Sequence, residues 1–136
     1  MGDSMSLIKA NNITNVAGGI PTVKGQKLIP TAWVNFNGTG TVSIRDSEGV
    51  SSIGDNGTGY YTVNFTNAMA NINYNVVGSC AANEGVQQTG MVTIHSNTAA
   101  VQVVPTTSAF SFISVNVNAA PFNSKHISIS VMGGQS

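Results

Sequence analysis

The chain has 136 residues, of which 41% are hydrophobic and only 7% are charged, and its formal net charge is zero. This length allows one domain with a core of its own. The lack of a basic patch argues against nucleic-acid binding, which requires neutralised phosphates, and no run approaches the ~18 apolar residues of a membrane helix. A weakly charged polar surface is typical of chains that assemble with others or make close hydrogen-bonded contacts.

Residues 1–30 are predicted to be an extended arm that serves attachment or trimerisation. A short helical pattern is confined to Ser6–Val16, and glycine and proline punctuate the segment that follows. The first residues carry neither the basic nor the apolar stretch of a signal peptide, so we expect none.

From about Thr31 onward the apolar residues recur at every second position, which is the period of a β-strand. Turns are predicted at Asn37–Gly40, Asp46–Gly49 and Gly54–Gly59, and a single helical turn at Thr66–Asn71. Strands are predicted at 32–36, 41–45, 50–53, 60–65, 74–78, 91–95, 100–104, 110–117 and 126–132. This pattern predicts an all-β fold, a compact sandwich or barrel of about nine short antiparallel strands.

The last two predicted strands differ in their patterns. The final strand alternates cleanly, so we expect three apolar side chains to face inward, namely Ile127, Ile129 and Val131. Segment 110–117 is instead apolar on both faces, with Phe110 and Phe112 on one of them. We therefore assign Phe110 and Phe112 to an interface with another subunit.

No pattern in the chain predicts catalysis. Asp46 and Glu48 share one predicted turn, whereas a glycosidase needs two carboxylates that face each other across the substrate. His95, His126 and the single Cys80 lack the clustered ligands of a zinc site. We expect no enzymatic activity, no cofactor and no metal within one chain, although a three-fold axis would bring three copies of one histidine together.

Three aromatic residues are candidate contacts. Trp33 is expected to pack in the core, and the alternative is a platform on which a sugar stacks. Tyr60 is expected to point outward, as an interface residue or a ligand contact, because Tyr61 takes the inward face. Phe122 lies in the polar segment Ala119–Lys125 and is either a loop anchor or a surface contact.

Four segments of this sequence resemble, in the same order, segments of a known protein family. They are Ala32–Arg45, Val50–Ile53, Asp55–Gly59 and Tyr61–Met69, and together they resemble the C-terminal domain of bacteriophage tail fibre proteins. The resemblance is collinear over about residues 31–78. After residue 78 the chain resembles the family only in its general pattern of polar loops and short strands.

The chain departs from the family pattern at one turn. Tyr60 stands where an acidic residue is usual, and Gly54 stands where a threonine is usual. The N-terminal segments Leu7–Ile13 and Val16–Gly19 also resemble, more weakly, the start of short phage fibre proteins.

The resemblance implies a homotrimeric virion component, made in the bacterial cytoplasm, whose tip domain at 31–136 binds a host-surface receptor, either a polysaccharide or an outer-membrane protein. The arm would bind another virion protein, with no nucleic acid and no membrane insertion involved. The receptor-binding residues are then expected at one turn and in two polar loops, namely Tyr60, Asn83, Glu84, Gln87, Gln88, Phe122, Asn123 and Lys125. Alternatives are a structural decoration or connector subunit without a receptor and, less favoured, a polysaccharide depolymerase.

Overall fold

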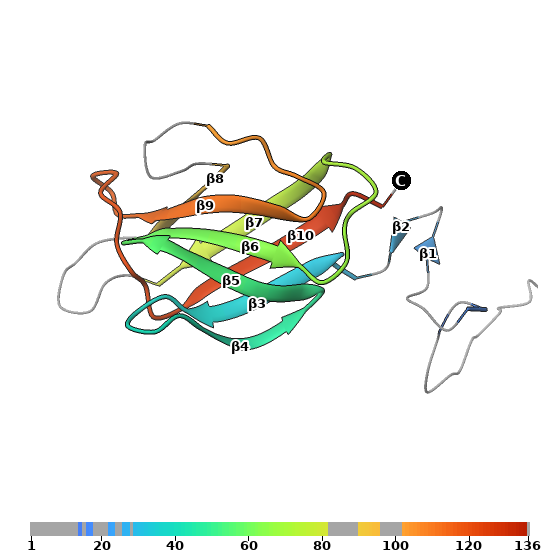
Figure 1. Cartoon of the computed structure of the whole chain (residues 1–136), viewed down its shortest axis with the longest axis horizontal. Helices are drawn as coiled ribbons and strands as arrows, with labels where there is room; N and C mark the ends of the chain where they lie inside the picture. Colours follow the sequence, from blue (N-terminus) through green and yellow to red (C-terminus); the bar gives the residue numbers. More distant parts are fainter. Residues whose placement is uncertain are drawn as a thin grey trace, which may run out of the picture.

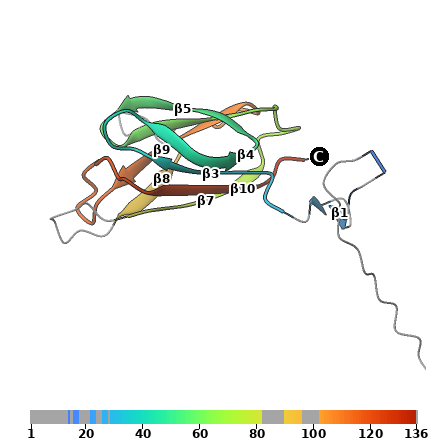
Figure 2. The same ribbon diagram turned by 90° about the horizontal axis from the view of Figure 1, so that it is seen from below.

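The computed structural model describes residues 31–81, 90–95 and 102–135, and in the N-terminal segment residues 14, 16, 17, 22, 23, 26, 27, 29 and 30. Eight strands in the described part form two antiparallel four-stranded sheets that pack face to face, as the two layers in Figure 2 show. None of these residues is helical, and so none forms a helix that could cross a membrane. The structure confirms the all-β prediction as a sandwich, since the described strands do not close into a barrel.

The two sheets are each built from strands far apart in the sequence (Figure 1). Sheet 1 has the order β4-β3-β10-β7, with β3 at Ala32–Asn37, β4 at Ser43–Glu48, β7 at Tyr74–Cys80 and β10 at Ile127–Gly133. Sheet 2 has the order β5-β6-β9-β8, with β5 at Val50–Gly57, β6 at Tyr60–Phe65, β8 at Met91–Ile94 and β9 at Ala109–Val115. Within the segment predicted as an arm, β1 (Thr22–Val23) and β2 (Gln26–Lys27) pair with each other.

Alternation decides which side chains form the core. Every second residue of β3, β6 and β10 is buried between the sheets, as expected for antiparallel strands with one covered face. The inward prediction for Ile127, Ile129 and Val131 is confirmed, because none of them is more than 2% exposed.

Phe110 and Phe112 do not lie at a subunit interface but in the core of the single chain, at 2% and 0% exposure. The Phe112 ring packs against Phe36 and Tyr61, with centroid separations of 6.2 and 5.4 Å. Rings covered in this way have no surface left for a neighbouring chain. The outward-facing Ile113 of the same strand is also buried, so β9 is covered on both sides within one chain there.

The predicted turn at Asp46–Gly49 is wrong. Strand β4 continues through Glu48, and after Gly49 alone the chain enters β5 in the other sheet. Gly49 has φ +69°, and a Cβ there would lie 3.0 Å from the Thr31 carbonyl oxygen. Glycine therefore lets a nearly continuous strand cross from one sheet to the other at the sandwich edge.

The second hairpin turn lies later than predicted. Strand β5 extends through Gly57, with a register shift after Asp55, so the turn consists of Thr58 and Gly59. The predicted helical turn at 66–71 is absent, since this connection is irregular. The described part of the predicted strand at 100–104, residues 102–104, contains no strand element either.

Gly59 has no room for a side chain, because backbone atoms surround it. It has φ +77°, and a Cβ would lie 2.7 Å from the Ser114 carbonyl oxygen and 2.8 Å from the Phe122 backbone nitrogen. We expect Gly59→Ala to lower the free energy of unfolding by about 3 kcal/mol, because left-handed strain adds to a clash with backbone atoms. Urea unfolding measures this change.

Gly40→Ala is the matched control. Gly40 has φ +62° but no atom within 4 Å of its would-be Cβ, so only the backbone strain applies. We expect a loss of about 1 kcal/mol. Equal losses for the two variants would contradict the packing assigned to Gly59.

Candidate functional site

The loop from 116 to 126 is anchored to the sandwich by residues that sequence analysis assigned to receptor binding. Phe122 is buried, at 8% exposure. The Asn123 amide oxygen accepts a hydrogen bond of 2.7 Å from the Gly59 backbone N–H and lies 3.0 Å from the Tyr61 hydroxyl. Phe122 and Asn123 are thus loop anchors, whereas Lys125 is exposed. The other predicted loop residues lie outside the described part of the chain, namely Asn83, Glu84, Gln87 and Gln88.

Tyr60 points outward from sheet 2, as predicted, and is partly exposed. The polar side chains near it on that face hydrogen-bond to one another. Asn56 Nδ2 donates to the Thr62 hydroxyl at 2.8 Å, and the Thr62 and Ser111 hydroxyl oxygens lie 3.0 Å apart. The face around Tyr60 therefore offers mostly hydroxyl and amide groups that already have protein partners.

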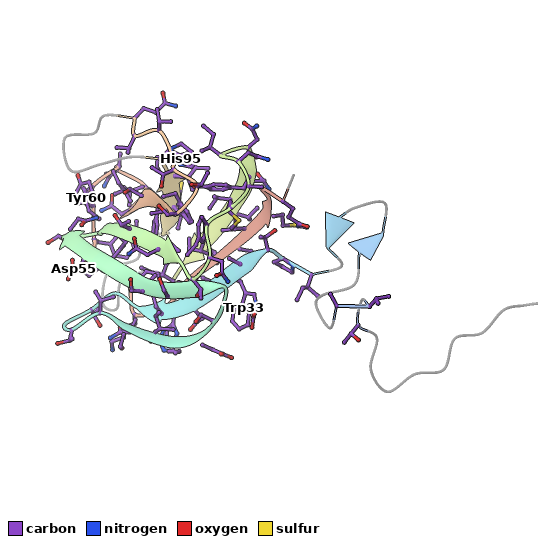
Figure 3. The ribbon with its side chains drawn as sticks, turned by 45° about the vertical axis from the view of Figure 1, so that its right-hand side comes forward. Trp33, Asp55, Tyr60 and His95 are labelled. Carbon is purple, nitrogen blue, oxygen red and sulfur yellow. The ribbon has the colours of Figure 1, made fainter. Side chains whose placement is uncertain are left out.

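Trp33 lies on the outer face of sheet 1, and the expectation that it packs in the core is wrong. Its neighbours Ala32 and Val34 are buried at 1% exposure, so alternation turns the indole to the other side, where it is partly exposed. Figure 3 shows Trp33 projecting away from the sandwich, well separated from Tyr60. The indole is a large apolar ring that carries a polar N–H, and it is partly exposed here.

The strand register defines two adjacent rows of outward side chains on sheet 1. The first row runs across the four strands through Glu48, Trp33, Ser130 and Val77, and the second through Asp46, Asn35, Ser128 and Ser79. We call these two rows, together with Arg45 and Lys125, the Trp33 face. It combines an aromatic ring with hydroxyl, amide, carboxylate and cationic groups, which is a composition suited to binding.

The polar groups of the Trp33 face are held in place by hydrogen bonds. Asn35 Nδ2 donates to Ser128 Oγ at 2.8 Å, and Asn35 Oδ1 accepts from Arg45 Nη1 at 3.4 Å. Arg45 Nη2 donates to the Lys125 carbonyl oxygen. This chain of contacts orients the guanidinium and the amide across three neighbouring elements, so less side-chain freedom is lost when a ligand binds.

The remaining titratable groups among the described residues form no second cluster. Burial lowers the pKa of His95, whose Nδ1 is buried without a hydrogen-bond partner and whose ring packs 6.2 Å from the Phe110 ring. Burial also raises the pKa of the Cys80 thiol, which is half-buried and donates to the Met91 carbonyl oxygen at 3.5 Å. Among the described residues, no group of three His, Cys, Asp or Glu side chains is placed to hold a metal.

Asp46 and Glu48 lie on one strand and not in a turn. Both carboxylates are exposed, and they point outward in adjacent rows of the same flat face. They do not face each other across a substrate in the manner of glycosidase carboxylates.

Comparison of the chain with protein-family models, with curated proteins and with solved structures finds no match. The candidate site therefore rests on the chain's own geometry. The signal that places Trp33 on the surface was present in the sequence, since the residue is out of phase with the alternating Ala32, Val34 and Phe36.

Alkaline unfolding tests the anchoring of the loop. Burial, with a smaller effect from Asp55, raises the pKa of Tyr61 from 10.0 to about 12. The unfolded chain therefore loses this proton at lower pH than the folded chain, and the free energy of unfolding falls as pH rises from 10 to about 12. Burial raises the pKa of Tyr74 to about 12 as well, so it contributes in the same window.

Tyr61→Phe removes one of these two contributions. We expect it to lower the free energy of unfolding at neutral pH by about 1–3 kcal/mol, because a buried hydrogen-bond partner is lost. It should also flatten the decline above pH 10. Tyr60→Phe is the control, and it should stay within about 0.5 kcal/mol of the unmodified chain because Tyr60 is partly exposed on the outer face of sheet 2.

The placement of Trp33 outside the core predicts a small effect on stability. We expect Trp33→Ala to change the free energy of unfolding by about 1 kcal/mol or less. Phe36→Ala, three positions along the same strand, should cost about 3–5 kcal/mol because Phe36 is fully buried. Denaturant unfolding of both variants measures the difference. If Trp33→Ala lowers the free energy of unfolding as much as Phe36→Ala does, the placement of the indole outside the core is contradicted.

Proposed function

We propose that the chain is a non-enzymatic receptor-binding domain of a bacteriophage tail fibre, which contacts the host surface through the Trp33 face. The observation that carries this proposal is a partly exposed tryptophan on a flat sheet face, beside polar groups already held by hydrogen bonds. Trp and Arg are the residues most enriched among those that dominate binding energy at interfaces. The collinear resemblance over about residues 31–78 supports the virion setting.

The proposal moves the receptor contact from the loops to a sheet. Of the predicted contacts, Phe122 and Asn123 have structural partners, and Tyr60 lies on the sheet opposite to Trp33. A single flat receptor patch cannot include both Trp33 and Tyr60. Lys125 remains part of the proposed contact because it is exposed and its carbonyl oxygen accepts a hydrogen bond from Arg45.

The assembly that accompanies this function is a homotrimer located in the virion and attached to another virion protein through residues 1–30. Light scattering on a sizing column should give about three times the chain mass of 14.0 kDa. Because Phe110 and Phe112 are in the core, the contacts between chains have to come from other surfaces.

A structural virion subunit without a receptor is the second candidate. It is favoured by two exposed apolar side chains near Trp33, which are Val77 at 60% and Met132 at 53% exposure. Exposed apolar groups that cluster are typical of assembly surfaces. In that case the chain would bind other virion proteins and not cells.

Binding of the fluorescently labelled chain to a panel of bacterial strains separates the two candidates. We expect saturable binding to at least one strain, measured by flow cytometry. Trp33→Ala should reduce this binding at least about ten-fold, equivalent to about 1.4 kcal/mol, whereas Tyr60→Ala on the opposite sheet should leave it unchanged.

Two results would contradict the proposal. If no strain of the panel binds the chain, the receptor-binding function fails and the structural candidate takes its place. If Tyr60→Ala abolishes binding while Trp33→Ala does not, the receptor contact lies on sheet 2 and not on the Trp33 face.

A further inference from the structure

Small side chains separate the two sides of the Trp33 face. The outward residues of β10 are Ser128, Ser130 and Met132, and the two serines are the ones that lie within the rows of the Trp33 face. Ser130 lies between Trp33 and Val77 in its row, and Ser128 lies between Asn35 and Ser79. A ligand that lies over these two rows would therefore have short side chains beneath it at β10 and the indole at one side.

The hydrogen-bonding groups here include donors and acceptors in close proximity. Ser128 accepts from Asn35 and keeps its own proton for donation, while Asn35 keeps one amide proton. Arg45 has further N–H groups beyond those used on Asn35 and the Lys125 carbonyl. The exposed carboxylates of Asp46 and Glu48 can only accept. Such a mixture matches hydroxyl groups, each of which both donates and accepts.

The charges of the Trp33 face cancel. Arg45 and Lys125 are cationic, and Asp46 and Glu48 are anionic, so the face as a whole has no excess of either sign. A polyanionic or polycationic ligand would meet repulsion as well as attraction on this face. An uncharged ligand has no such conflict, and the carboxylates can accept bonds from its hydroxyl groups.

A second copy of the chain fits the same face less well. The centres of protein–protein interfaces are depleted in charged residues. Here the tryptophan is directly opposite Glu48, and the next row brings Asp46 and Arg45 close to it. Burying these groups against another protein would remove them from water without assured partners.

We infer that the Trp33 face binds a neutral hexopyranose glycan of the cell surface. Trp33 stacks on the C–H side of one sugar ring, and Asn35, Ser128 and Arg45 hydrogen-bond to ring hydroxyls beside it. This inference rests on the proposed receptor-binding function, because it names the chemical class of the receptor that the same face takes.

Trp33 is the only tryptophan of the chain, so its fluorescence reports directly on the site. The purified full chain is first applied to an array of bacterial surface polysaccharides, neutral and charged. The strongest neutral binder is then titrated against the chain. We expect a saturable change in tryptophan emission, and isothermal titration calorimetry gives the affinity of variants that lack the indole.

The variants are chosen as matched pairs. Trp33→Ala and Asn35→Ala should each weaken glycan binding at least about ten-fold. Asn64→Ala is the control, because Asn64 makes the same kind of bond, from Nδ2 to Ser52 Oγ at 3.1 Å, on the outer face of sheet 2. Its glycan affinity should be unchanged. Asn35→Ala keeps the fluorescent indole and therefore also tests the inference by emission.

The outcomes distinguish this inference from the proposed function. If cells bind the chain but no neutral polysaccharide does, or if charged polysaccharides alone bind, the receptor function stands and the glycan inference is overturned. A neutral glycan whose affinity is insensitive to both Trp33→Ala and Asn35→Ala also overturns it. If glycans bind as expected but no cell does, the glycan inference is upheld and the adsorption role fails.

Discussion

A small buried hydrogen-bond network joins the two sheets at one end of the sandwich. The Asn123 amide oxygen accepts from the Gly59 N–H and lies 3.0 Å from the Tyr61 hydroxyl, which also lies 2.9 Å from the Gly38 carbonyl oxygen. Gly38 belongs to the hairpin connection of sheet 1 and Gly59 to that of sheet 2. Because an unpaired buried polar atom is costly, the loss of one member leaves the others unsatisfied. The two hairpins and the β9–β10 loop are therefore linked to one another at this end of the sandwich.

Sequence analysis predicted correctly the strands that have one apolar and one polar face, and it failed where both faces of a strand are polar. Strands β6 and β10 were recognised because inward apolar residues alternate with outward polar ones. The end of β4 was taken for a turn because it lies at a sheet edge and is polar throughout. The structural role of Asn123 could not be predicted, since its partner Gly59 is 64 positions away and no local pattern links them. Trp33 is different, because its phase along β3 was readable and only the general tendency of tryptophan to be buried suggested the core.

The two outer faces of the sandwich have different chemistry. On sheet 2 the hydroxyl and amide groups bond to one another, as in the pairs Thr62–Ser111 and Asn64–Ser52. On sheet 1 the network around Asn35 ends in a guanidinium that is exposed and has further protons to donate. A face whose polar groups are internally paired gains little from a ligand, whereas partly paired groups that are already oriented gain more. The asymmetry between the sheets is the reason for preferring sheet 1 as the recognition surface.

Strand β3 lies inside sheet 1, between β4 and β10, and it is the strand by which the chain enters the sandwich. Trp33 is its second residue, and just before the strand the Thr31 N–H already donates to the Val131 carbonyl oxygen. A pull on the N-terminal segment would therefore reach the sandwich at the first residues of β3. Directed along the strand, it would load the hydrogen bonds to both neighbouring strands in shear, so that they resist together and do not open one at a time. Because β3 lies between two partner strands, its resistance to such a pull comes from both sides at once.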